Sequence, residues 1–196
     1  MTDPLVEVGD GGTPIDENEV HGLLPTWVRT RRDLNEAEAT NIDAANRAVG
    51  SVDLEKATDD LWLRRLHRSM FCDVWERAGQ YRLTERNIGI DPIDIAPAVR
   101  TLVRDCRTWF EFEPGRIPVA RFHHRMVAIH PFPNGNGRHA RVATDHLCVA
   151  AGMSRPSWGA NTNVDLVDLR ADYLAALRNA DRDGEDLDRL VSFMWS

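Results

Sequence analysis

Apolar residues recur at intervals of three and four through most of the chain, in blocks bounded by proline and glycine. The block at residues 58–77 ends before Gly79, and its apolar side chains are Trp62, Leu63, Leu66, Met70, Val74 and Trp75. This spacing places apolar side chains on one side of a helix, whereas a half-buried strand would alternate polar and apolar residues. The aromatic and methionine residues are therefore predicted to be core side chains, not a cofactor site.

Capping residues and prolines divide the rest of the chain into further helices. Thr13 to Asp16 is predicted to start a short helical turn that Gly22 ends, and Asp33 to Glu36 is predicted as a second capping box. Further helices are expected over 97–113, 118–129, 136–151, 164–180 and 185–195. Residues 81–92 break the helical rhythm and are predicted to be extended, as a short hairpin. The expected fold class is all-α with one small β-hairpin.

Composition restricts the functions open to the chain. A length of 196 residues suits one domain, and a net charge of −7 argues against a general nucleic-acid-binding surface. The start is acidic and no apolar run approaches the ~20 residues of a membrane span, so neither a secretory signal nor a membrane partner is expected. Cys72, Cys106 and Cys148 are predicted to be reduced core residues, which suits a cytoplasmic protein.

The stretch 119–141 inverts this charge balance, with four arginines, four of the seven histidines, and neither Asp nor Glu. Gly135 and Gly137 leave space for backbone N–H groups to turn toward one anion, and the helix expected to start there adds its own N–H groups. Arg138 and Arg141 lie three positions apart and are expected on one helix face. Glycine, asparagine and arginine in this order predict a phosphate-binding loop.

His130 precedes this loop and is the candidate general base, because an imidazole has a reference pKa of about 6.5. The alternative for a lone histidine is a helix C-cap or a core residue. Phe132 is expected to anchor the loop in the core. A zinc site of His123, His124 and His130 is disfavoured, because adjacent residues lie on different sides of a helix.

The run HPFPNGNGRHAR (130–141) resembles the signature of the Fic family, H-x-F-x-[D/E]-G-N-G-R-x-x-R. The likeness covers about 57–196, including AGQYRLTERNIGI, and with SWG at 157–159 it is most similar to the mobile mystery protein B branch. It implies a Fic-like helical bundle at 57–196, with residues 1–56 as an N-terminal extension packed on it. Fic proteins usually transfer AMP from ATP to a hydroxyl side chain of a target protein and release pyrophosphate.

The resemblance also implies roles for single residues. His130 would deprotonate the target hydroxyl, and the phosphates would be held by Gly135, Asn136, Gly137, Arg138 and Arg141. The flap at about 84–91 would align the target by strand-like pairing, through Asn87, Ile88, Gly89 and Ile90.

Two further features concern regulation and the metal. Asn134 stands where the family has Asp or Glu for Mg²⁺, so the metal is expected to be weakly held. Residues 13–18 match an inhibitory motif of the family, which would direct Glu17 to Arg141. Self-inhibition of this kind, or an antitoxin-like partner, is thus implied beside the target protein.

Three functions follow as alternatives. The first is a protein adenylyltransferase. The second is a degenerate nucleotide-binding or interaction protein that no longer catalyses, which Asn134 favours. The third is a transferase of the same fold with another donor or transferred group, such as a kinase.

Overall fold

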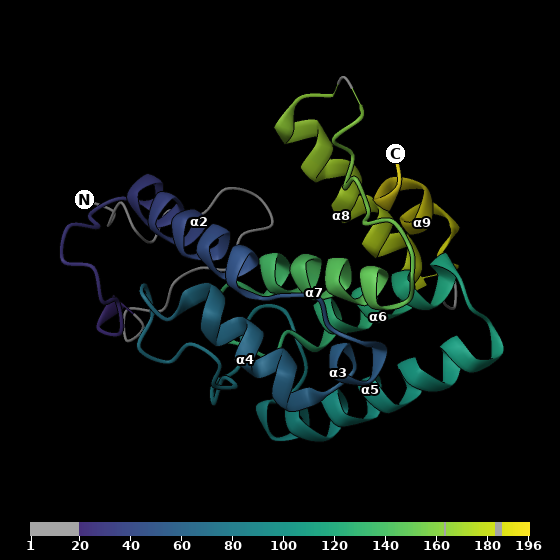
Figure 1. The fold of residues 1–196 in the computed structure, drawn as a ribbon. Helices are drawn as coiled ribbons and strands as arrows, with labels where there is room; N and C mark the ends of the chain where they lie inside the picture. Colours follow the sequence, from purple (N-terminus) through teal and green to yellow (C-terminus); the bar gives the residue numbers. More distant parts are fainter. Residues whose placement is uncertain (1–19, 163, 183–185) are drawn as a thin grey trace.

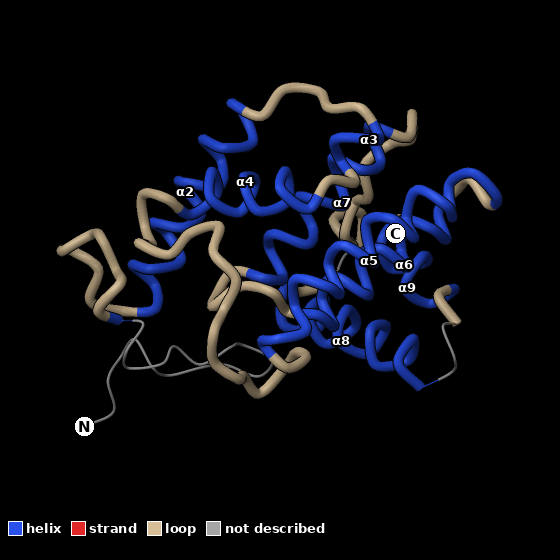
Figure 2. Tube along the Cα trace, turned by 90° about the horizontal axis from the view of Figure 1, so that it is seen from below, coloured by secondary structure: helices blue, strands red, loops and turns tan. Residues whose placement is uncertain are grey.

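Helix α7 (Asn136–Ala150) lies in the middle of the fold, with α6 (Arg116–Ile129) and α4 (Asp60–Phe71) packed against it (Figure 1). The computed structural model describes residues 20–162, 164–182 and 186–196. The remaining elements are α2 (Arg31–Ala48), α3 (Leu54–Ala57), the 3₁₀ turn η1 (Pro92–Asp94), α5 (Ile95–Phe112), α8 (Leu166–Arg182) and α9 (Asp188–Met194). The described ranges contain no β-strand, as Figure 2 shows, so the predicted all-α class is confirmed.

Two apolar cores hold these helices together. The larger one joins α2, α4, α5, α6 and α7, and the second joins α8 and α9 to α6. Trp62 on α4 meets the ring of His146 on α7 edge-on, with centroids 5.5 Å apart. The predicted apolar stripe of residues 58–77 is buried as expected.

Helix α4 ends at Phe71, earlier than the spacing predicts, because the following backbone groups bond elsewhere. The N–H of Leu24 donates to the carbonyl of Val74, and the N–H of Glu76 donates to that of Gly22. An isolated antiparallel bridge joins Leu23 and Trp75 beside them. Val74 and Trp75 therefore stay buried without being helical. Cys72, just past the helix end, is exposed, so its predicted place in the core was wrong.

Helix α2 begins three residues before the predicted capping box. Its N-cap is Thr30, whose hydroxyl accepts from the N–H of Asp33, while the Asp33 carboxylate accepts from the N–H of Thr30. The box is thus Thr30 with Asp33, and not Asp33 with Glu36. The other predicted turn, at Thr13 to Asp16, lies outside the described residues.

Helix α2 packs along α4 through polar as well as apolar contacts. Asn41, which is 6% exposed, accepts from the N–H of Asp73 and donates to the carbonyl of Ser69. A buried amide satisfied in this way fixes the register of two helices more closely than apolar contacts do. No helix in the described ranges is both long and apolar enough to cross a membrane.

Candidate active site

The loop between α6 and α7 is closed by its own side chains. Phe132 is 1% exposed, which confirms the predicted anchor. The Asn136 amide donates to the carbonyl of Phe132 (2.7 Å) and accepts from its N–H (2.8 Å). The Asn136 side chain therefore shapes the loop, and only its backbone N–H remains in position for an anion.

Gly135 cannot be substituted by another residue without disturbing this loop. It lies at φ +68°, and a Cβ atom there would be 2.4 Å from the Phe71 ring. Gly137, by contrast, lies within α7 and has open space where a Cβ would point, so the two glycines play different parts. The first N–H groups of α7, which no helix can pair internally, follow directly, at the place where the predicted anion would lie.

His67 on α4 holds the other side of the loop. Its Nδ1 accepts from the N–H of Gly79 (2.9 Å), so its Nε2 carries the proton and donates to the carbonyl of Asn134 (3.2 Å). Its ring stacks on Phe132 with centroids 3.8 Å apart. Burial lowers the pKa of His67 well below its usual value, and this keeps the ring neutral. The position of Asn134 is thus set from within the core.

His130, the candidate base, caps the C-terminus of α6 with a left-handed backbone (φ 52°) and is 7% exposed. Burial, reinforced by the positive charge of Arg82, lowers its pKa to about 4. The imidazole is neutral at pH 7 and can accept a proton. A bound polyphosphate would stabilise the protonated form and raise this pKa toward neutrality.

Arg82 ties the flap to the start of the α6–α7 loop. It is 2% exposed, and its guanidinium donates to the carbonyls of His130 (2.7 Å), Thr84 (3.0 Å) and Ile90. Its backbone N–H donates to Pro131 (2.9 Å). These contacts use the carbonyls that a hairpin ladder would need, so residues 81–91 form an open loop and the predicted hairpin is not present.

The flap residues lie beside His130. Asn87, Ile88 and Gly89 are exposed, and the N–H of Ile90 reaches the carbonyl of Ile129 at 3.5 Å. Gly89 lies at φ +113°, and a Cβ there would be 2.8 Å from that of His130. These three residues are therefore open to solvent next to His130.

Arg138 and Arg141 contact different neighbours, contrary to a simple paired clamp. Arg138 lies over the Phe71 ring and donates to the Glu38 carboxylate of α2 at 2.6 Å. Glu38 is 2% exposed and also accepts from the Trp75 indole at 2.8 Å. Part of the positive charge of the motif is thus neutralised by α2.

Arg141 lies against two aromatic rings. Its guanidinium carbon is 4.6 Å from the Tyr173 ring and 5.8 Å from that of Trp158. The Trp158 indole in turn donates to Asp145 (2.9 Å). Burial of this carboxyl group raises its pKa to about 6. The rings hold Arg141, and no ion pair joins its guanidinium to a carboxylate of the described residues.

The adjacent histidines His123 and His124, which with His130 were weighed as zinc ligands, contact different neighbours. His123 bonds Thr144 and Tyr173, whereas His124 bonds Asp181. Throughout the described part of the chain, no group of three His, Cys, Asp or Glu could hold a metal. Glu17, the expected inhibitory residue, lies outside the described residues.

The residues at the phosphate loop do not form a preformed Mg²⁺ site. Asn134 offers one neutral amide oxygen, and Mg²⁺ prefers charged carboxylates. Its backbone carbonyl is already occupied by His67. Any metal there would be held largely by the nucleotide, and the chemistry that this chain itself supplies comes from its histidine, arginine and backbone groups.

Comparison with known proteins now decides the family of this site. Residues 58–148 match the model of the Fic/DOC family. These residues are a Fic domain. The Fic domain thus contains α4 through nearly all of α7, and with them the loop, the candidate base and the flap. The closer likeness to the mobile mystery protein B branch and the boundary at residue 57 stay predictions.

Solved structures share the fold beyond this range. The N-terminal Fic domain of the effector Bep8 from Bartonella sp. 1-1C aligns with a TM-score of 0.69 and 16% identity, covering 87% of this chain and 88% of that one. BepC from Bartonella tribocorum, solved with bound AMPPNP, aligns with a TM-score of 0.67 and 16% identity over 91% and 96%. A Fic domain from Bartonella quintana was solved with bound ADP (TM-score 0.67, 16% identity, 86% of each chain). No curated protein matches this sequence.

Sequence patterns did not single out three side chains that shape the site: Glu38, His67 and Arg82. One signal for Glu38 was present, because positions 34, 38, 41 and 45 fall on one helical face, where two polar residues stand among apolar ones. Arg82 stood out only as part of a segment of family likeness. His67 gave no signal, since its contacts are 12 and 67 positions away.

Proposed function

We propose that the chain is a protein adenylyltransferase that transfers AMP from ATP to a hydroxyl side chain of a target protein. The observation that carries the proposal is a neutral His130 at the start of the loop that leads into the N-terminus of α7, beside an exposed flap. A general base beside bound phosphates suits the activation of an acceptor hydroxyl. The AMPPNP and ADP bound by the Bartonella proteins support a nucleotide as donor.

In the proposed reaction the target hydroxyl gives its proton to His130 as its oxygen bonds to the α-phosphorus of ATP. The bond from that phosphorus to the bridging oxygen breaks, and pyrophosphate leaves. The N–H groups at the start of α7 would stabilise the charge on the phosphates, and Arg141, on the same helix, would add a guanidinium. His67 and Arg82 would hold the loop and the base in place.

A second candidate is a nucleotide-binding protein without transfer activity. Asn134 and the pairing of Arg138 with Glu38 favour it, because both reduce the charge available to phosphates and metal. A change of transferred group would give a third function, that of a kinase.

Incubation with candidate target proteins and ATP labelled at the α or the γ position separates these functions. Label on protein from the α position alone supports adenylylation, and label from the γ position alone means phosphoryl transfer. His130→Ala should abolish labelling, while ATP binding stays within about threefold. Binding without any labelling would favour the non-catalytic protein.

A further inference from the structure

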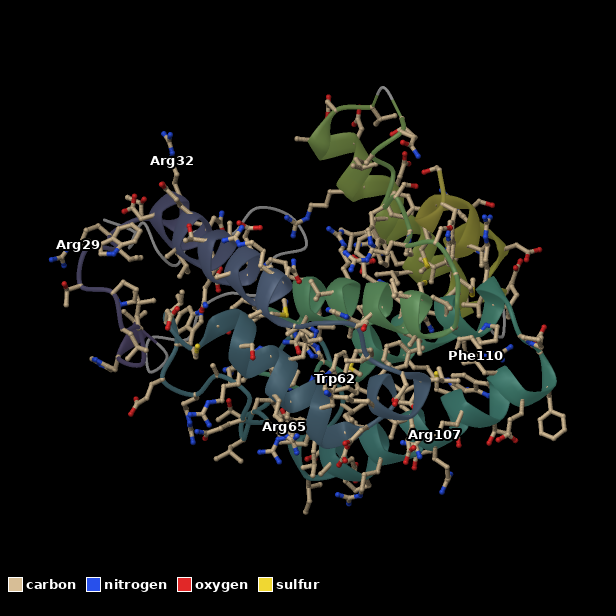
Figure 3. The ribbon with its side chains drawn as sticks, in the orientation of Figure 1. Arg29, Arg32, Trp62, Arg65, Arg107 and Phe110 are labelled. Atoms are coloured by element: carbon tan, nitrogen blue, oxygen red, sulfur yellow. The ribbon has the colours of Figure 1, made fainter. Side chains whose placement is uncertain are left out.

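Arginines gather in a cavity on the outer side of α4. The cavity has a volume of about 560 Å³ and is lined by Arg64, Arg65 and Arg68. Figure 3 shows Arg65 on the side of α4 away from α7, whereas Trp62 lies toward α7. In a chain of net charge −7, three arginines around one cavity are a local excess of positive charge.

Two of these arginines are available to a partner. Arg64 donates to the carbonyl of Gly79 and lies over the Tyr81 ring. Arg65 and Arg68 are exposed and make no ion pair with any described residue. Their charges are therefore not neutralised by the described surface around them.

The same cavity has apolar walls. Leu24 is 49% exposed and Leu61 is 48% exposed, and both line it. The buried Trp75 also lines it. A surface that combines exposed leucines with guanidinium groups fits a ligand that carries both apolar and acidic side chains.

A second cavity of about 530 Å³ lies next to the first and has residues of the candidate active site in its walls. It shares Trp75, Glu76, Ala78 and Gln80 with the first cavity. Its other walls include Asn134 of the phosphate loop, Thr84 and Arg86 of the flap, and Arg77. Together the two cavities are lined by six arginines, with Glu76 as the acidic residue among them.

We propose that these two neighbouring cavities dock an acidic segment of the target protein, next to the hydroxyl that is modified. The proposal rests on the proposed function and adds the chemistry of the substrate: acidic side chains with at least one apolar side chain, close in sequence to the acceptor. Strand-like pairing between the flap backbone and the target would hardly distinguish one target side chain from another. The arginines therefore supply the selectivity that the flap lacks.

A protein segment fits this surface better than a nucleic acid does. The rest of the chain is acidic and would repel a long polyanion, whereas a short acidic peptide meets the arginines alone. The half-exposed leucines also match amino-acid side chains and not a sugar–phosphate backbone.

Binding of two peptides to the full-length protein tests the proposal without nucleotide. Both carry a fluorophore and a central threonine with one leucine; one has four glutamates and the other four glutamines. Fluorescence anisotropy at low salt should show at least tenfold tighter binding of the glutamate peptide. Arg65→Glu with Arg68→Glu should remove this preference, while Arg104→Glu with Arg170→Glu, exposed positions on α5 and α8, should keep it.

Three results would overturn the proposal. If the Arg65→Glu/Arg68→Glu protein preferred the glutamate peptide as strongly as the wild type does, these arginines would be excluded as the docking site. Equally tight binding of a 12-nucleotide single-stranded DNA would indicate a general polyanion surface. Binding seen only after the six acidic residues of positions 1–19 are changed to amides would mean that the chain occupies the cavities itself.

The result is separable from the proposed function, because binding is measured without transfer. Failure of AMP transfer would leave the binding preference intact. Equal transfer to both peptides by the wild-type protein would refute docking and leave the transferase standing.

Discussion

The carboxylate of Glu38 lies 2.6 Å from the guanidinium of Arg138, so a helix one hundred positions earlier pairs with the phosphate-binding motif. The pair is nearly closed to solvent on the Glu38 side, where the exposed fraction is 2%. A phosphate that approaches Arg138 must compete with this carboxylate. The first turn of the motif helix is therefore coupled to the position of α2.

Glu38→Gln should bind ATP more tightly than the wild type. Glutamine keeps an acceptor for the Trp75 indole but removes the negative charge that opposes the phosphates. We expect a gain of about five- to tenfold in affinity, with a loss of roughly 1–3 kcal/mol in unfolding free energy. Calorimetric titration with ATP and urea denaturation measure the two effects. Glu36→Gln, on the exposed side of α2, should change neither.

Gly135→Ala and Gly137→Ala should have opposite effects on stability. Alanine at 135 must adopt φ +68° and push against Phe71, which we expect to cost about 2–4 kcal/mol and at least tenfold in ATP affinity. Alanine at 137 lies in a helix with open space and should add up to about 1 kcal/mol. Thermal unfolding of both variants decides this, and equal losses would contradict the assigned roles.

Asn134→Asp should restore a charged ligand beside the nucleotide. The concentration of Mg²⁺ that gives half-maximal ATP binding should fall by about tenfold relative to the wild type. The variant keeps the backbone carbonyl that His67 holds, so the loop should not change. Asn46→Asp adds the same charge on the exposed side of α2 and serves as the control. Superimposable Mg²⁺ titrations of all three proteins would refute a metal role for position 134.

Much of this architecture follows from local sequence. Apolar periodicity predicts the helices because each buries one side, and the buried Trp62, Leu66 and Met70 follow from it directly. The motif predicts the loop because its glycines and Phe132 act within ten residues of one another. The end of α4 at Phe71 could not be predicted in this way, since residues 22–24 take the hydrogen bonds.

Long-range polar contacts are the part that sequence did not show. Spacing alone placed Arg138 and Arg141 together, yet Glu38 draws one guanidinium to α2 while Tyr173 and Trp158 hold the other. The predicted hairpin is absent for the same reason. The Arg82 side chain donates to backbone carbonyls that a β-ladder would need. Partners that are distant in sequence leave no periodic signal.

Arg82→Lys should separate the geometry of the flap from the charge near His130. Lysine keeps the positive charge, so the pKa of His130 should stay near 4 in the protein without nucleotide. It cannot reach three carbonyls at once, so kcat of the proposed transfer should fall by roughly 10- to 100-fold. NMR titration of the His130 ring gives the pKa, and it should rise when ATP binds.

The control for this experiment is Arg104→Lys. Arg104 is exposed on α5 and pairs with Asp105, its neighbour in the chain. Its kcat should remain within about threefold of the wild type. An unchanged kcat in Arg82→Lys would show that Arg82 does not position the base.

Acidification below pH 6.5 should destabilise the chain through buried histidines. Burial lowers the pKa of His123 to about 3 and that of His139 to about 4, as it does for His130. The unfolded chain, with a histidine pKa near 6.5, then binds protons that the folded chain does not, so stability falls as pH decreases from about 6.5 to 4. Asp145 opposes this trend, because a pKa raised to about 6 favours the folded state on acidification.

Each unit of depressed pKa corresponds to about 1.4 kcal/mol, so several histidines outweigh one aspartate. The urea midpoint should therefore be lower at pH 5 than at pH 7. His123→Gln should be less stable at pH 7, because it loses the paired bonds to Thr144 and Tyr173, but its stability should change less between the two pH values. A midpoint that rises on acidification in the wild type would mean that the carboxyl groups, and not the buried histidines, control its stability.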